Sequence, residues 1–504
     1  MITKTKKKKT LSVGAEWTFK LLRSYQHEIE RIAKNFGLDT YPNQIEIISS
    51  EQMIDVYATV GMPVGYHHWS FGKQFVTVEK EYKKGHMGLA YELIINSNPA
   101  IAYLLEENTM PMQALVIAHA CYGHNSFFKG NYLFKLWTSP DSIVDYLVFA
   151  RNYIAECEEK YGTSTVEELL DACHALMPNG VFRYKHPHTL SLQDEKIRQR
   201  NREQYLQSQV NELWRIIPHS EKTDTRDAKK SFPEEPQENL LYFMEKHAPL
   251  LEPWQREIIR IIRKMAQYFY PQRQTKVMNE GWATFWHYTI MNQLYDEKLV
   301  TDEFMLEVLH NHTGVIAQPS FDSPYFSGIN PYTLGFNMFK DIRRMCENPT
   351  EEDKQWFPYL VNTPWQETLD FAMRNFKDES FIAQYLSPRL IRELKLFAIL
   401  DDDQKPDMLV SAIHDDHGYQ KIRDVLSGQY NLGNLEPDIQ IVNVDFTGSR
   451  TLTLRHTERD RRPLSKTVTE IMKYLYALWQ FPIELESINT AGEIVATYRC
   501  PDTI

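Results

Sequence analysis

The residues with the clearest chemical potential are two histidines in one apolar stretch. His119 and His124 lie in VIAHACYGH, five residues apart, with Gly123 directly before the second. A helix that binds a metal ion through two histidines normally spaces them four apart, with a glutamate after the first. Here that position holds Ala120. On a regular helix a separation of five places two side chains about 140° apart, which is too far to share one ion.

Two departures from a regular helix would bring these histidines together. A π-bulge places residues i and i+5 on one face. Alternatively, Gly123 ends the helix and His124 returns from the turn that follows. A third interpretation is purely structural, with two hydrogen-bonded histidines in the core. Cys121 lies between them, and we interpret it as a small buried side chain rather than a ligand.

A third ligand is predicted in MNEGWATFWHYTIMN, which has the pattern of a helix with Glu280, either Ala283 or Thr284, and His287 on one face. A glutamate is costly to bury in so apolar a helix unless it is paired or bound to a metal. Two histidines from one helix and a glutamate from a later one form a known zinc ligand set. We therefore expect His119, His124 and Glu280 to hold a divalent metal, with zinc as the first candidate and His287 nearby.

The absent glutamate matters because EGWA and CYGH resemble the metal-binding segments of gluzincin-type zinc peptidases. That resemblance implies a zincin-like main domain. In those enzymes the glutamate replaced here by Ala120 is the general base. Another carboxylate must take its role, and Glu92 in the apolar strand-like segment YELIINSNP is the first candidate.

Other polar side chains are weaker candidates for this site. The aromatic loop GYHHWSFGKQF would form a pocket wall. Two acidic or mixed pairs could substitute for the missing base, and a further histidine pair receives less weight. These residues are His67 and His68 in the loop, Asp171 with His174, Glu106 with Glu107, and His310 with His312.

The composition of the whole chain and the motifs that it lacks disfavour several classes of function. It has 504 residues and a net charge of −11, which disfavours nucleic-acid binding. No run of about 18 apolar residues predicts a membrane span, and no apolar segment follows the basic run at Lys4 to Lys9. Five scattered cysteines indicate reduced thiols. We expect a cytoplasmic protein. Phosphate loops, dinucleotide fingerprints and nucleophile elbows are absent from the sequence.

The hydrophobic pattern predicts an α+β, predominantly helical fold. Helices are expected over most of the first 60 residues, at SNPAIAYLLEEN and at NTMPMQALVIAHACYGH. Strands are expected at FVTVEKEY and LAYELIINSNP. Beyond Asp438 the pattern predicts a small β-β-α-β-β module. The expected regions are 1–217 with the two histidines, a linker or long surface loop at 218–239, a helical region at 240–400 with Glu280, and a C-terminal α+β module at 401–504.

Five long strings together resemble the SpoVR family, the stage V sporulation protein R group. They are GYHHWSFGKQF, YELIINSNP, AHACYGHNSFFKGN, NEGWATFWH and SPYFSGINPY. The resemblance implies a cytoplasmic bacterial protein tied to formation of the spore cortex, a peptidoglycan layer. In non-sporulating bacteria it implies stationary-phase or stress settings, with a PrkA-type kinase and a von Willebrand-A-like protein as partners. The family supplies no reaction.

Two functions remain from different classes. The first is a regulatory protein of cell-wall formation or stress that keeps a zincin-like metal site, which the loss of the glutamate at Ala120 favours. The second is a zinc-dependent hydrolase of an amide bond in a peptide or muropeptide-like substrate, with Glu92 as base. The many histidines and aromatic residues near the first motif favour this second function.

Overall fold

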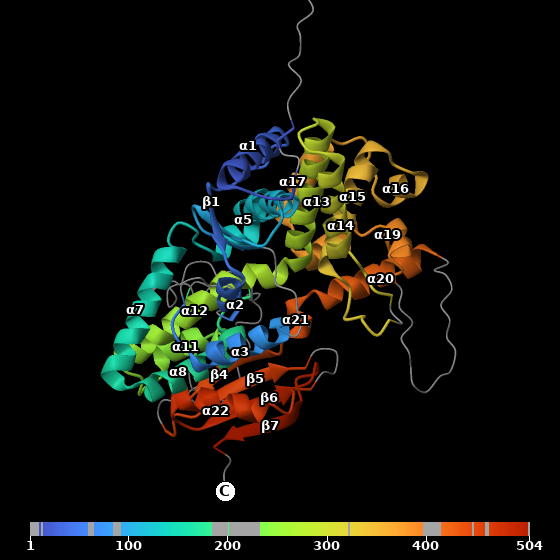
Figure 1. Cartoon of the computed structure of the whole chain (residues 1–504). Helices are drawn as coiled ribbons and strands as arrows, with labels where there is room; N and C mark the ends of the chain where they lie inside the picture. Colours follow the sequence, from blue (N-terminus) through green and yellow to red (C-terminus); the bar gives the residue numbers. More distant parts are fainter. Residues whose placement is uncertain are drawn as a thin grey trace, which may run out of the picture. The chain divides into compact units, whose positions relative to one another are not determined.

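The computed structural model describes residues 10–11, 14–58, 65–83, 92–183, 200, 232–320, 323–396, 415–445, 448–458 and 463–501. Figure 1 labels many of the helices and strands of the chain, which divides into two compact units. The first contains Met1–Glu167 and Gln267–Glu436, and the second contains Glu168–Ala266 and Pro437–Ile504. These units interleave along the chain, whereas the sequence suggested consecutive regions. Most of the predicted linker, residues 218–231, lies outside the described residues.

The first unit is mainly helical. Its elements are α1 (Phe19–Asn35), β1 (Asn43–Ile48), α2 (Ser50–Ala58), α3 (Trp69–Lys83), β2 (Glu92–Ile95), β3 (Ala100–Leu105), α4 (Met110–Val116), η1 (Ile117–His124), α5 (Asn125–Gly130), α6 (Tyr132–Trp137), α7 (Ile143–Tyr161), α13 (Lys276–Asp296), α14 (Asp302–Val315), α15 (Pro331–Glu347), α16 (Glu351–Trp356), α17 (Trp365–Asn375), α18 (Asp378–Tyr385), α19 (Pro388–Glu393), α20 (Asp416–Gln429) and α21 (Leu432–Leu435). Helices α8 (Thr163–Ala175) and α12 (Pro253–Gln274) cross the division between the units.

A three-stranded sheet in this unit corrects several predictions. Its order is β1-β3-β2, with β1 parallel and β2 antiparallel to the central β3. The segment SNPAIAYLLEEN, predicted to be a helix, forms β3, because pairing on both sides outweighs the helix preference of its alanines and leucines. The strand β1 was missed. FVTVEKEY, predicted to be a strand, lies inside α3, whose Val78 is buried against α2.

The core of the first unit is built around α13. This helix packs against both η1 and α15, and glycines allow the close approach. A Cβ atom added at Gly281 would lie 2.3 Å from the backbone of Gly335. One added at Gly123 would lie 2.5 Å from the Cα of Ala283. Real Cβ atoms do not approach so closely, so these contacts fix the position of α13 relative to the other two helices.

The N-terminus of α13 is capped from another helix. Asp378, the first residue of α18, is buried and accepts hydrogen bonds from the backbone N–H groups of Val277 at 2.9 Å and Met278 at 2.8 Å. The residue at the helix's own N-cap position, Thr275, makes no such bond. The side chain of Asp378 therefore satisfies two N–H groups that a helix end leaves without partners.

The second unit contains η2 (Met177–Asn179), α11 (Leu240–His247), β4 (Asp438–Val444), β5 (Leu452–Thr457), α22 (Val468–Trp479), β6 (Ile483–Ile488) and β7 (Ile494–Cys500). The last five elements confirm the predicted β-β-α-β-β module. Their sheet has the order β4-β5-β6-β7 and is parallel only between β5 and β6, which α22 connects. Within the described end of the predicted linker, Gln237 bridges to Ile441 of β4.

Across the described ranges, no helix is both long and apolar enough to cross a membrane.

Candidate metal centre

The two histidines share one face because η1 is a π-helix. Thr109 caps α4, which leads directly into η1, and the N–H of Asn125 donates to the carbonyl of Ala120, five residues earlier. This confirms the first of the two predicted departures from a regular helix. The prediction that Gly123 ends the helix is wrong, because the chain continues without a break into α5. Gly123 instead makes room for Ala283 of α13.

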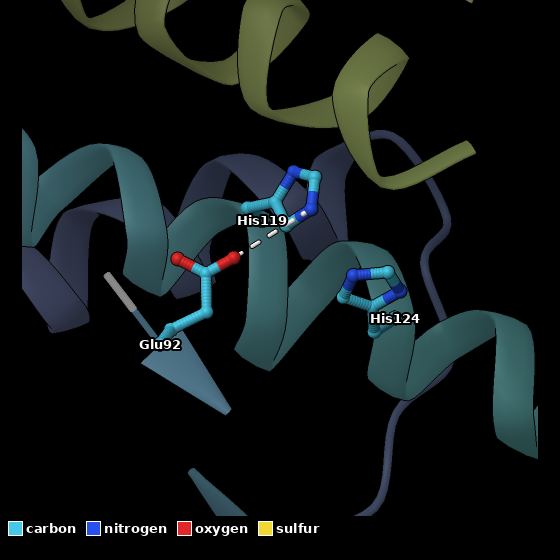
Figure 2. Close-up of side chains that lie close together, drawn as sticks. All are labelled: Glu92, His119 and His124. Carbon is cyan, nitrogen blue, oxygen red and sulfur yellow. Dashed lines mark ion pairs between the residues drawn. The ribbon is translucent and has the colours of Figure 1, made fainter. Parts of the chain in front are cut away.

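Glu92 reaches this site from β2. Its Oε1 lies 3.6 Å from Nε2 of His119, and Figure 2 shows the carboxylate pointing toward that ring. The rings of His119 and His124 are 4.6 Å apart and nearly perpendicular. One ligand atom from each of Glu92, His119 and His124 lies within 4.8 Å of the others. The structure therefore brings the predicted base to the two predicted histidines.

Glu280 approaches the same atoms from α13. Its Oε2 lies 3.5 Å from Nε2 of His124 and 3.9 Å from Nε2 of His119. This oxygen is buried and has no hydrogen-bond partner. A buried carboxylate oxygen without a partner is costly. Oε2 of Glu280 therefore lacks a hydrogen-bond donor or cation that would offset the cost of its burial.

The other ring nitrogen of each histidine is already engaged. Nδ1 of His124 lies 2.9 Å from Oδ1 of Asn279, so this ring donates there and presents Nε2 as an acceptor. Nδ1 of His119 lies 2.8 Å from Nδ1 of His287. Metal-binding histidines are commonly oriented in this way by a hydrogen bond at the second nitrogen.

Burial sets the charges of the site. It lowers the pKa of His119 to about 4, so this histidine stays neutral. Burial, followed by the charge of Glu280, raises the pKa of Glu92 to about 8. Burial alone would raise the pKa of Glu280 as well, but the neighbouring His124, His119 and Tyr332 outweigh it and lower that pKa. Among the described residues, no lysine or arginine forms an ion pair with either carboxylate.

This donor set fits a divalent metal. Tetrahedral coordination at ligand distances of about 2.0–2.2 Å separates neighbouring donor atoms by roughly 3.3–3.6 Å. The separations of 3.5, 3.6 and 3.9 Å are at or slightly above that range. Two imidazole nitrogens and one or two carboxylates suit zinc and related transition metals. A cation would also satisfy Oε2 of Glu280 and offset the charge of two neighbouring carboxylates.

The remaining predicted residues lie elsewhere or in the other unit. His67 is exposed, and the buried His68 hydrogen-bonds Ser70 at the start of α3 and packs against Trp69 and Phe71. Exposed residues Glu106 and Glu107 form the turn after β3. Asp171 and His174 lie on the part of α8 that belongs to the second unit.

Three residues at or behind the site were missed or given little weight. Asn279 precedes Glu280 and orients His124, and its polar side chain within an apolar helix was a usable signal. Tyr332 lies at the start of α15, stacks beside the ring of His119 with centroids 6.3 Å apart and helps to lower the pKa of Glu280. His312 is buried and hydrogen-bonds His287, whereas its neighbour His310 is exposed. The buried face of α14 runs through Phe304, Val308 and His312 at intervals of four residues, so helical periodicity was a usable signal that favours His312 over His310.

Comparison with known proteins gives a consistent result. Residues 16–435 match the family model described as SpoVR like protein, and residues 437–490 match the SpoVR-like C-terminal domain. The chain is 62% identical over 491 residues to "Uncharacterized protein YcgB" of Escherichia coli (strain K12), covering 97% of this chain and 96% of that relative. No solved structure matches.

Proposed function

The chain belongs to the SpoVR family, and we propose that its first unit holds a zincin-like divalent metal centre that hydrolyses an amide bond. His119, His124 and Glu280 would bind the metal, with zinc as the first candidate. The proposal is carried by one observation: Oε2 of Glu280 is buried without a hydrogen-bond partner, beside the Nε2 atoms of two histidines.

The role of Glu92 follows from its place beside the site. When bound, the metal would supply a Lewis acid that polarises the substrate carbonyl. Glu92 would accept a proton from the attacking water while the oxygen of that water bonds to the carbonyl carbon. It would then return that proton to the leaving nitrogen as the C–N bond breaks. Tyr332, which lowers the pKa of Glu280, would help to keep that carboxylate ionised. Glu92 thus takes, from a strand, the role that Ala120 cannot fill.

A second function is favoured by the same proximity. Glu92 lies as close to His119 as Glu280 does, so it would also suit the position of a fourth ligand. Four protein ligands close a zinc site, as in sites that serve a structural purpose. The protein would then be a regulatory member of the family whose metal stabilises the fold. Substitution of Glu92 separates these functions. Loss of a base would stop hydrolysis and leave the metal bound, whereas loss of a ligand would weaken metal binding.

The biological setting is proposed from the family alone. A cytoplasmic role in cell-wall formation, spore cortex synthesis or stationary-phase stress would make peptidoglycan-derived peptides the first substrates to test. A PrkA-type kinase and a von Willebrand-A-like protein are the partners to test first. Neither nucleic acid nor a membrane is needed for the chemistry proposed.

The test begins with elemental analysis of the purified chain. We expect about one zinc-class ion per chain in the wild type, and loss of that ion in His119→Ala. His310→Ala, at an exposed histidine of α14, is the matched control and should retain it. A wild type that takes up no divalent metal at stoichiometric concentration would contradict both functions.

Glu92→Gln then separates the two functions. If Glu92 is the base, this variant keeps its metal and loses hydrolysis of muropeptides, measured as released amine by mass spectrometry. If Glu92 is a ligand, metal affinity falls instead and the wild type releases no amine. Glu106→Gln, at an exposed glutamate, is the control and should change neither quantity.

A further inference from the structure

Behind the candidate site, three buried histidines form a continuous hydrogen-bonded row. Nδ1 of His119 lies 2.8 Å from Nδ1 of His287, and Nε2 of His287 lies 2.8 Å from Nδ1 of His312. They come from three elements, η1, α13 and α14, all in the first unit. Their exposed fractions are 3%, 1% and 4%. These rings are therefore shielded from bulk solvent.

The geometry of the row allows only one pattern of protons once the site is occupied. A contact between two Nδ1 atoms needs one proton, carried by one of the two neutral rings. If Nε2 of His119 faces a metal, its proton must be on Nδ1 and must point to His287. The Nδ1 of His287 then accepts, so its own proton is on Nε2 and is donated to Nδ1 of His312. Each ring fixes the tautomer of the next.

His312 is held firmly enough to set this pattern. Its ring packs against Tyr288 of α13 and Phe336 of α15, each with ring centroids 4.9 Å away. Its Nδ1 faces His287 and accepts the hydrogen bond that anchors the row. The row therefore ends in a ring whose orientation is fixed by packing rather than by solvent.

We propose that His287 and His312 are positioning residues that fix the Nδ1–H tautomer of His119 and so aim its Nε2 lone pair into the metal centre. The inference rests on the proposed metal-binding function. It gives His312, remote from the metal, a measurable effect on metal affinity. The other histidine, His124, is oriented by a hydrogen bond to Asn279 and by stacking on Phe128.

The test compares two replacements of His312. In His312→Asn the Oδ1 atom occupies nearly the position of Nδ1 and accepts from His287. In His312→Leu the volume is similar but the acceptor is lost. Zinc affinity, measured by competition with a chromophoric chelator, should fall about 10- to 100-fold in the leucine variant. It should stay within a few-fold of the wild type in the asparagine variant. His310→Leu, two residues earlier and exposed, is the control.

A spectroscopic readout separates orientation from general damage. The d–d absorption of the cobalt-loaded protein reports the ligand geometry and should change in His312→Leu but not in His312→Asn. Equal affinity and identical spectra in all three proteins would overturn the inference, as would equal loss in both variants. A wild type that binds neither zinc nor cobalt would instead refute the proposed function.

A second measurement uses only the wild type, so it does not depend on whether a variant folds. In nitrogen-15 spectra of the zinc-loaded wild type, His287 and His312 should both be the Nε2–H tautomer, with His119 protonated at Nδ1. The opposite tautomer at His287 would overturn the inference even if His312→Leu does not fold.

Discussion

The contact between Gly123 and α13 predicts a large effect from a single added methyl group. In Gly123→Ala the new Cβ would lie 2.5 Å from the Cα and 2.8 Å from the Cβ of Ala283. Ordinary carbon contacts are about 3.5–4.0 Å, so the two helices must separate locally by roughly 1–1.5 Å. Overpacking of this kind costs about 1–3 kcal/mol of folding free energy.

The same displacement should weaken metal binding. Gly123 directly precedes His124, and Ala283 lies three residues after Glu280, so the shift separates two proposed ligands. Metal sites tolerate deviations of only about 0.2 Å in ligand distance. We expect at least a tenfold loss of zinc affinity, with helix content by circular dichroism unchanged. Ala283→Gly should not rescue the variant, because the nearest clash is with a backbone atom.

A matched glycine provides the control for both measurements. Gly314 lies in α14, and nothing lies within 4 Å of where its Cβ would be. Gly314→Ala should therefore leave zinc affinity unchanged and stabilise the helix by up to about 1 kcal/mol. The assays are chemical denaturation in the presence of a chelator and zinc titration against a competing chelator. Equal free energies of unfolding and equal zinc affinities in Gly123→Ala and Gly314→Ala would refute this prediction.

Three further predictions concern parts of the chain outside the metal ligands. Asp378→Ala should cost about 1–3 kcal/mol in chelator-treated protein, because two buried N–H groups of α13 lose their acceptor, whereas the exposed Asp424→Ala should be neutral in the same denaturation assay. Burial would raise the pKa of Asp353, but hydrogen bonds from Arg344 and Thr350 lower it to about 2. Its stabilisation, about 2 kcal/mol, should be complete above about pH 4 and vanish toward pH 2, so a stability deficit in Asp353→Asn that persists at pH 2 would contradict this. Limited proteolysis should cut first within Pro218–Asn239, which has few apolar side chains, and a first cut within η1 would contradict the assignment of the core.

The sequence predicted the parts of the fold with strong local patterns. The C-terminal module alternates clearly in its strands, and the apolar run in NTMPMQALVIAHACYGH predicted the helix that begins with α4. The secondary structure was predicted wrongly where strand pairing with distant segments decides between helix and strand. Segment Ala100–Leu105 is a strand because β1 and β2 flank it, and nothing within the segment reports those partners. The charged end of FVTVEKEY suits the helix α3 that forms instead of a strand.

The candidate site shows the same limit. Spacing indicated that a π-helix was one of two ways to bring His119 and His124 together, but it could not choose between them. The choice depends on Gly123, whose missing side chain serves contact with Ala283 rather than a turn. Contacts between distant segments, such as Glu92 with His119, are set by the packing of β2 on η1. Such contacts have no local sequence signature.

The central claim is that one metal ion binds between η1 and α13. Crystals of the zinc-loaded chain measured on both sides of the zinc absorption edge test this most directly. The account predicts an anomalous difference peak about 2.0–2.2 Å from Nε2 of His119, Nε2 of His124 and a carboxylate oxygen of Glu280. It would be contradicted by the absence of a peak there, or by a peak at another site with these three side chains unliganded.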